Sequence, residues 1–125
     1  MNIERKNYPA LALPAGPYAH AVEHNGLLYV SGLTAFGTLA QARGLAEQAE
    51  AAFAQLATIA SNEHVSLASL LKVTLYVTTF EGIDELRAVL THLYGRALPA
   101  SSIVQVAGLF APELRIEVEA ILALR

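Results

Sequence analysis

The sequence predicts an α+β fold, a mixed sheet with two helices on one face. Three observations predict it: strand-like segments joined by Asn25-Gly26, two segments with apolar residues at helical spacing, and alternating strands between and after them. The resulting order is ββ-α-β-α-ββ, which is typical of a single sheet covered by one layer of helices. The 125 residues fit a single domain spanning residues 1–125.

The first regular element is a β-hairpin that follows the proline-rich segment 9–17. Residues 19–24 and 27–31 have strand-like composition, and Asn25-Gly26 stands between them. This dipeptide is a strong signal for a type I′ turn, because that turn needs positive φ at both central positions. Residues 32–44 are expected to be loop-like.

Two helices are predicted from the spacing of apolar residues. Residues 82–94 form one, with a stripe of Ile83, Leu86, Leu90 and Leu93, and Gly95 is placed to end it. Residues 45–63 form the longer one. Its expected buried face consists of Leu45, Ala49, Ala52, Phe53, Leu56, Ile59 and Ala60.

Three further strands are predicted at residues 70–78, 102–107 and 115–124. Glu117 and Glu119 share one face of the last strand, but both faces of residues 120–124 are apolar, as in strands buried on both sides. Because two helices cover one face of a sheet, we expect another subunit on the second face. In residues 70–78 one face is expected to carry Leu71, Val73, Leu75 and Val77, and the other Lys72, Thr74, Tyr76 and Thr78.

Composition excludes several classes of protein. With 54% hydrophobic and 15% charged residues the chain is not intrinsically disordered, and no apolar run is long enough for a membrane span. The absence of cysteine excludes disulfides, thiol catalysis and cysteine-based zinc sites. The net charge of −3, with scattered basic residues, argues against nucleic acid as a partner. No signal-peptide pattern is present, so a cytoplasmic location is expected.

The residues alone give one candidate for chemistry. The four histidines lack metal-ligand spacing, no phosphate-binding glycine motif occurs, and the serines lack a nucleophile elbow. Glu117 and Glu119 remain. A buried carboxyl has a raised pKa and suits a group that positions or deprotonates water. The alternative is that both glutamates face solvent or pair with Arg115, and the residue pattern alone favours this alternative.

Five short segments, in this order and spacing, resemble the Rid family, also called RidA or YjgF and formerly endoribonuclease L-PSP. The resemblance covers nearly the whole chain, although the loop after Gly32 is shorter than is usual in the family. It implies a chorismate-mutase-like fold and a homotrimer with three clefts between subunits. The segments are Gly16-Pro17-Tyr18-Ala19-His20-Ala21-Val22, Leu28-Tyr29-Val30-Ser31-Gly32, Leu71-Lys72-Val73-Thr74-Leu75-Tyr76-Val77-Thr78, Leu98-Pro99-Ala100-Ser101-Ser102 and Ile116-Glu117-Val118-Glu119-Ala120.

The resemblance also implies an activity without any metal or organic cofactor. Family members hydrolyse 2-imino and 2-enamino acids to 2-keto acids and ammonia. An Arg holds the substrate carboxylate, a Glu orients the attacking water, and backbone groups near a Pro-Ala-Arg-Ser segment hold the nitrogen. By this resemblance Glu119 is the catalytic carboxylate, and Tyr18, Ser31 and Gly32 bind the small-molecule substrate.

Three positions depart from the family pattern. Ser101 stands where the family has the Arg, Ile103 where it often has Cys, and Arg87 at a helix position often filled by a substrate-facing Asn. Losing the Arg removes a charge-assisted pair worth roughly 1.5–3 kcal/mol. We therefore expect Ser101, Ile103 and Arg87 to alter substrate binding.

Three functions follow as hypotheses. The protein is an imine or enamine deaminase with a preference other than 2-imino acids, in which Arg87 or Arg115 replaces the missing cation. Alternatively, it is a non-catalytic trimeric module that binds a small molecule. A role on RNA, as the older family label suggests, is disfavoured by the charge. Because Tyr18 and Glu119 match the family, the sequence slightly favours the deaminase.

Overall fold

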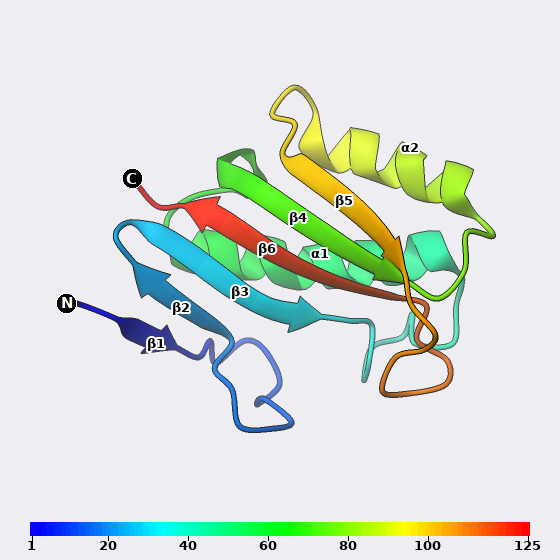
Figure 1. Cartoon of the computed structure of the whole chain (residues 1–125), viewed down its shortest axis with the longest axis horizontal. Coiled ribbons are helices and arrows are strands. Elements are labelled where there is room, and N and C mark those ends of the chain that lie inside the picture. The colour runs from blue at the N-terminus through cyan, green and yellow to red at the C-terminus, as the bar shows by residue number, and fades with distance from the viewer.

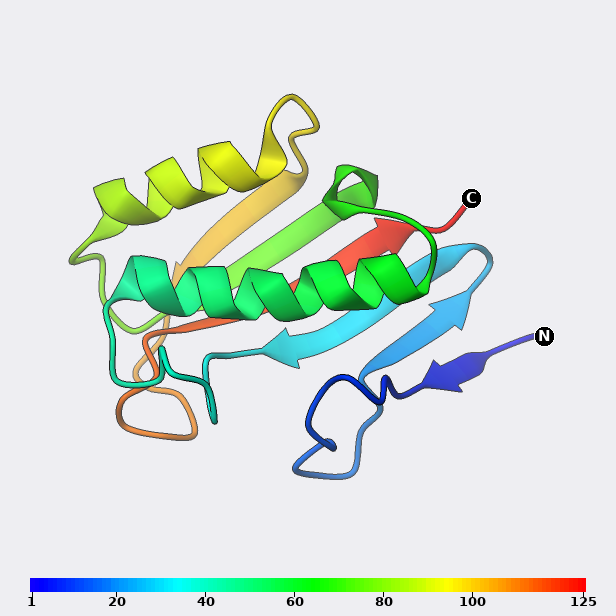
Figure 2. The same cartoon turned by 180° about the vertical axis from the view of Figure 1, so that it is seen from behind.

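Six strands form one mixed sheet, and both helices pack on the same face of it (Figure 1, Figure 2). The computed structural model describes residues 1–125. The predicted α+β fold is confirmed. In chain order the elements are β1 (Glu4–Lys6), β2 (Ala21–His24), β3 (Leu27–Leu33), α1 (Leu45–Asn62), the 3-10 turn η1 (Leu67–Ser69), β4 (Leu70–Val77), α2 (Ile83–Tyr94), β5 (Ala100–Gln105) and β6 (Ile116–Ala123).

The last strand lies in the interior of the sheet. The strand order is β1-β2-β3-β6-β4-β5, so β6 pairs with β3 on one side and β4 on the other. Only β4 and β5 are parallel, and α2 connects them. The predicted hairpin between β2 and β3 is confirmed, with φ of 52° at Asn25 and 77° at Gly26.

The core lies between the sheet and α1. All seven apolar residues of the predicted stripe on α1 are buried, including Phe53, Leu56 and Ile59, which are fully enclosed. On α2 only Leu86 and Leu90 are buried, because this helix covers the edge of the sheet. Gly95 ends α2 with φ of 56°, a conformation that favours glycine.

Several features of the sheet differ from the prediction, and one is that β3 continues to Leu33, two residues into the expected loop. Strand β1 was not predicted, and β5 begins and ends two residues earlier than expected. A register shift between Leu70 and Lys72 on β4 buries Leu70 and leaves Leu71 46% exposed, so the expected alternation fails at Leu71. From Val73 to Val77 the alternation is confirmed.

The second face of the sheet is uncovered. Ile121 and Ala123 on β6 are half-buried, while Leu122 between them is fully buried on the helix side. Tyr29 and Val104 expose large apolar groups on the same sheet. The expected burial of β6 on both sides is therefore incomplete within one chain, and the covering subunit stays a prediction.

Two loops are held together by one buried amide. The side-chain nitrogen of Gln48 donates to the carbonyl oxygens of Gln41, Arg43 and Glu113 at 2.9–3.0 Å. Its oxygen accepts the backbone N–H of Arg115 at 2.8 Å. Gln48 thus fixes the loop that precedes α1 against the loop that precedes β6.

Candidate functional site

A cavity of about 440 Å³ lies where β3 ends. Its walls come from the loop between β1 and β2, the end of β3, α1, β6 and the two loops that Gln48 holds. The lining residues are Leu11, Ala12, Leu13, Pro14, Ala15, Tyr18, His20, Ser31, Gly32, Leu33, Thr34, Phe36, Gln55, Phe110 and Glu117.

Glu117 is the acid of this cavity. Burial raises the pKa of the half-buried Glu117 carboxyl, and the negative charge of Glu119 raises it further. Both causes disfavour the charged form. A carboxyl whose pKa lies above its usual range is suited to accept a proton from water and return it later.

Gly32 makes room for the Glu117 carboxyl. A Cβ atom at position 32 would lie 2.7 Å from Cδ of Glu117 and closer still to Oε2. Val30 pairs with Ala120 and Leu33 with Val118, so β3 holds one residue more than β6 over this stretch. Such a bulge redirects side chains locally. Here it lays the backbone of Gly32 against Glu117.

Tyr18 and Ser31 line the same cavity. The hydroxyl of Ser31 donates to the carbonyl oxygen of Ala19 at 2.7 Å, which ties β3 to the residue next to Tyr18. The phenol oxygen of Tyr18 accepts the backbone N–H of Ala15 at 3.3 Å. Because this bond uses an oxygen lone pair, the phenol hydrogen remains available to a ligand.

His20 holds the cavity wall in place. Its ring is buried, Nδ1 accepts the backbone N–H of Tyr8 at 2.9 Å, and Nε2 lies 2.8 Å from the carbonyl oxygen of Ala12. Since Nδ1 accepts, Nε2 carries the hydrogen and donates it to Ala12. Both ring nitrogens are thereby occupied, and His20 acts as an internal brace.

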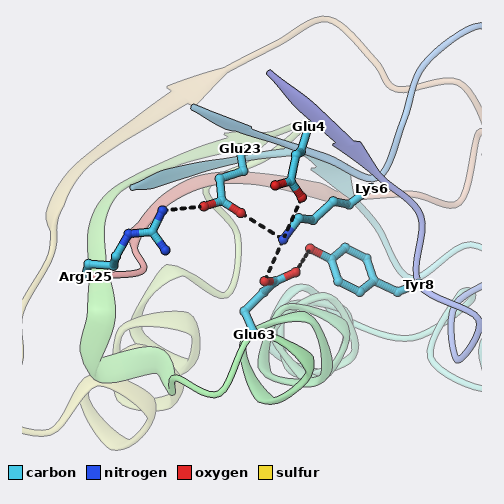
Figure 3. A network of polar contacts seen from close by, with 6 residues as sticks. All are labelled: Glu4, Lys6, Tyr8, Glu23, Glu63 and Arg125. Carbon is cyan, nitrogen blue, oxygen red and sulfur yellow. Dashed lines mark hydrogen bonds and ion pairs between the residues drawn. The ribbon is translucent and has the colours of Figure 1, made fainter. Parts of the chain in front are cut away.

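A network of charged residues anchors the start of this wall (Figure 3). The ammonium of Lys6 lies 2.8 Å from carboxylates of both Glu23 and Glu63, and Tyr8 donates to Glu63 at 2.7 Å. The hydrogen bond from Lys6 lowers the pKa of Glu23, and hydrogen bonds to Glu23 and Glu63 raise the pKa of Lys6. The network joins β1 and β2 to the end of α1.

The structure does not bring Glu119 into the cavity. Glu119 accepts a hydrogen bond from the hydroxyl of Tyr76 on the open face of the sheet, and this bond raises the pKa of Tyr76. A shallow recess there also contains Tyr29 and Lys72. Of the two glutamates on β6, only Glu117 shares a cavity with Tyr18, Ser31 and Gly32.

The three departing positions lie elsewhere on the chain. Ser101 and Ile103 belong to β5, and β6 and β4 separate β5 from β3. Arg87 is on the solvent side of α2, 3.7 Å from Asp84. Arg115 does not line the cavity. The single chain therefore brings together Tyr18, Ser31 and Gly32, but not Arg87, Ser101 or Ile103.

Sequence reasoning did not identify the aromatic part of the site. Phe36 and Phe110 come from the two loops joined by Gln48, and their ring centres lie 5.1 Å apart. Neither loop has a periodic pattern that places its side chains. One signal for Glu117 was present, since a glycine inside a strand often marks the close approach of another group.

Comparison with known proteins assigns this chain to a family. The family model "Endoribonuclease L-PSP" matches residues 9–124. A crystal structure from Mycobacterium tuberculosis, described as a member of the YjgF/YER057c/UK114 family, superposes with a TM-score of 0.75 at 28% identity, covering 85% of this chain and 86% of that one.

Two curated relatives were also found. A RutC family protein of Aquifex aeolicus (strain VF5) is 31% identical over 83 residues, 65% of this chain and 66% of that protein. A 2-iminobutanoate/2-iminopropanoate deaminase of Dermatophagoides farinae is 25% identical over 119 residues, 93% of this chain and 92% of that protein.

The protein is thus an α+β domain with a small-molecule-sized cavity at a strand bulge. It belongs to the endoribonuclease L-PSP family, also called the YjgF or Rid family. Neither helix is long and apolar enough to cross a membrane. No group of three or more His, Asp or Glu side chains is arranged to hold a metal ion.

Proposed function

We propose that the protein hydrolyses an imine or enamine without a cofactor, and that Glu117 activates the water. The observation that carries the proposal is the half-buried Glu117 carboxyl in a cavity with Tyr18, beside the backbone of Gly32. A substrate bound in this cavity would lie beside the carboxyl, together with the water that the carboxyl activates. This arrangement makes the attack on the substrate local.

The reaction balances with water as the only co-substrate. Glu117 accepts a proton from the water as the water oxygen bonds to the imine carbon, and it returns that proton to the nitrogen to give a carbinolamine. Glu117 next accepts the proton of the carbinolamine hydroxyl and passes it to the nitrogen as the C–N bond breaks, so the nitrogen leaves as ammonia or an amine and the oxygen remains as the carbonyl. An enamine first takes a proton at carbon to become the imine.

The similarity to the Dermatophagoides farinae deaminase supports this chemistry, because that protein's name describes deamination of 2-iminobutanoate and 2-iminopropanoate and the match spans 93% of this chain. Ser101 in place of the expected Arg distinguishes this chain. A hydroxyl cannot supply the charge-assisted, two-pronged contact that an Arg gives to a carboxylate. We therefore propose a substrate preference other than 2-imino acids.

We further propose that three copies assemble through the open face of the sheet. The uncovered Tyr29 and Val104 and the half-buried Ile121 support this assembly. A cleft between subunits would place the β5 edge of one copy, with Ser101 and Ile103, near the cavity of the next. Native mass spectrometry at micromolar concentration tests the assembly, for which we expect the trimer mass; a spectrum containing only the monomer contradicts it.

The activity is tested with a panel of imines, generated in situ from amino acids and amines by oxidases, by following release of ammonia. We expect wild-type protein to exceed the buffer rate on at least one imine, and Glu117→Gln to remove the excess while keeping its circular dichroism spectrum. If no imine is hydrolysed faster than in buffer, the deaminase is ruled out.

The second candidate is the non-catalytic binding module, which the presence of Ser101 in place of the family's Arg favours. It retains the cavity but lacks turnover. A ligand at about one hundred times its Kd would stabilise the folded protein by roughly 2.7 kcal/mol, so thermal shifts with small metabolites detect it. Stabilisation without hydrolysis of any imine would select this function over the deaminase.

A further inference from the structure

We infer that the cavity takes a substrate without a carboxylate, namely an imine or enamine with an aromatic or branched aliphatic group and a neutral or positively charged nitrogen. The inference rests on the proposed function and adds the class of substrate. It also assigns Phe36 and Phe110 as the residues that select the apolar group. Two observations support this substrate class: the charges at the cavity and the apolar surface around it.

The charges at the cavity disfavour an anion. Glu117 is the only acid among the fifteen lining residues, and neither Lys nor Arg is present. The nitrogens of His20 are engaged by Tyr8 and Ala12, so this ring offers no donor to a ligand. A carboxylate here would face the charge of Glu117 without a counter-ion from the same chain, and the proposed neighbouring copy would bring the neutral hydroxyl of Ser101 rather than an Arg. A neutral imine avoids that repulsion, and a protonated iminium is attracted to Glu117.

The mouth of the cavity is apolar on several sides. Phe36 and Phe110 lie at 59° to each other and remain 55% and 66% exposed. Leu13 from the loop between β1 and β2 is 85% exposed, and half-exposed Tyr18 completes the group. Apolar groups gathered around an opening mark a binding site. A ligand ring inserted between Phe36 and Leu13 would remove these surfaces from water.

The two aromatic rings are held in place, as a specificity pocket requires. Phe36 and Phe110 stand on the loops that buried Gln48 joins through four hydrogen bonds. The backbone N–H of Phe36 also donates to the hydroxyl of Thr34 at 3.2 Å. Because the loops are fixed, the pair presents an ordered surface, which lowers the entropic cost of binding.

Three probes of the same shape and different charge test the inference. Benzamidine is a cation, benzamide is neutral and benzoate is an anion, and isothermal titration calorimetry measures each Kd. We expect benzamidine to bind best and benzoate worst, with at least tenfold between them. In Glu117→Gln the advantage of benzamidine over benzamide should disappear. Tighter binding of benzoate than of benzamide by the wild type overturns the inference.

Substitutions at the mouth test the apolar part. Phe36→Ala and Phe110→Ala should each weaken binding of benzamide about tenfold, as expected for a lost aromatic contact. Phe80→Ala is the matched control, because Phe80 is 47% exposed and does not line the cavity. If Phe36→Ala changes the mass measured by light scattering and leaves Kd unchanged, the pair is a subunit contact and the inference fails.

Turnover separates this inference from the proposed function. The wild type should hydrolyse benzophenone imine with a higher kcat/KM than 2-iminopropanoate. If 2-iminopropanoate is the better substrate, the proposed hydrolase stands and the substrate class is wrong. If neither these two imines nor any other imine of the panel is hydrolysed but the three probes bind in the expected order, the hydrolase fails, and the cavity's preference for carboxylate-free ligands is retained.

Discussion

Gly32→Ala tests the contact on which the proposed chemistry depends. The new Cβ would lie 2.7 Å from Cδ of Glu117, whereas an ordinary van der Waals contact begins at 3.4 Å. The carboxyl must therefore move by at least 0.7 Å, the difference between these two distances. Because a misplacement of about 1 Å can cost on the order of 100-fold in rate, we expect kcat to fall by about 10- to 100-fold.

The Gly32→Ala substitution should lower kcat without lowering the free energy of unfolding to a similar degree. The φ of Gly32 is not in the left-handed region, so alanine fits the backbone, and glycine-to-alanine replacement at such a site stabilises by about 0.4–1 kcal/mol. The flexible end of Glu117 can shift to accommodate the methyl group. Urea unfolding should therefore give a free energy within about 1 kcal/mol of the wild type, although kcat has fallen.

A control and a double substitution complete the experiment. Gly108→Ala adds the same methyl group where no atom lies within 4 Å, and its kcat should match the wild type. Adding Gly32→Ala to Glu117→Gln should cost no further activity, because both act on the same group. A Gly32→Ala protein that is folded and fully active would refute the reasoning.

The remaining predictions concern the loops, the pH dependence and the substrate. Gln48→Leu removes the four hydrogen bonds of a fully buried side chain and should destabilise the fold by about 1–3 kcal/mol in urea unfolding. The charge of Glu119 helps to raise the pKa of Glu117, so Glu119→Gln should move the acid limb of the profile of kcat/KM against pH to lower pH. The pKa of Glu117 is higher in the folded than in the unfolded protein, so folding favours the protonated carboxyl. The contribution of this carboxyl to the free energy of unfolding is therefore fully present below the unfolded-state pKa and is lost as pH rises through the folded-state pKa. Glu117→Gln should therefore unfold at higher urea than wild type at pH 7, with the difference vanishing in acid. Ser101→Arg should increase kcat/KM for carboxylated imines selectively, and unchanged selectivity would argue that position 101 does not reach the ligand.

Local chemistry made part of the fold predictable. Asn25-Gly26 requires a turn with positive φ wherever it stands between strands, and the stripe on α1 needs only helical geometry to find the core. Strand β1 has three residues, and its place depends on contacts of Lys6 with Glu23 and Glu63, far away in the sequence. The exposure of Leu71 likewise depends on the register with β6.

The candidate site was less predictable, because it depends on a bulge. Glu117 and Glu119 occupy equivalent positions in the alternation of β6, and no local pattern distinguishes them. The extra residue of β3 sets Gly32 against Glu117, while Glu119 turns to Tyr76. Tyr18, Ser31 and Gly32 were identified by resemblance, and the structure places all three on one cavity.

The most direct test compares the two glutamates of β6 in one assay. Initial rates of ammonia release from a single imine are measured at neutral pH for wild type, Glu117→Gln and Glu119→Gln. Removing a general base costs on the order of 10²- to 10⁴-fold, so Glu117→Gln should fall to the buffer rate. The Glu119→Gln protein should remain close to wild type. An inactive Glu119→Gln protein beside an active Glu117→Gln protein would contradict the assignment.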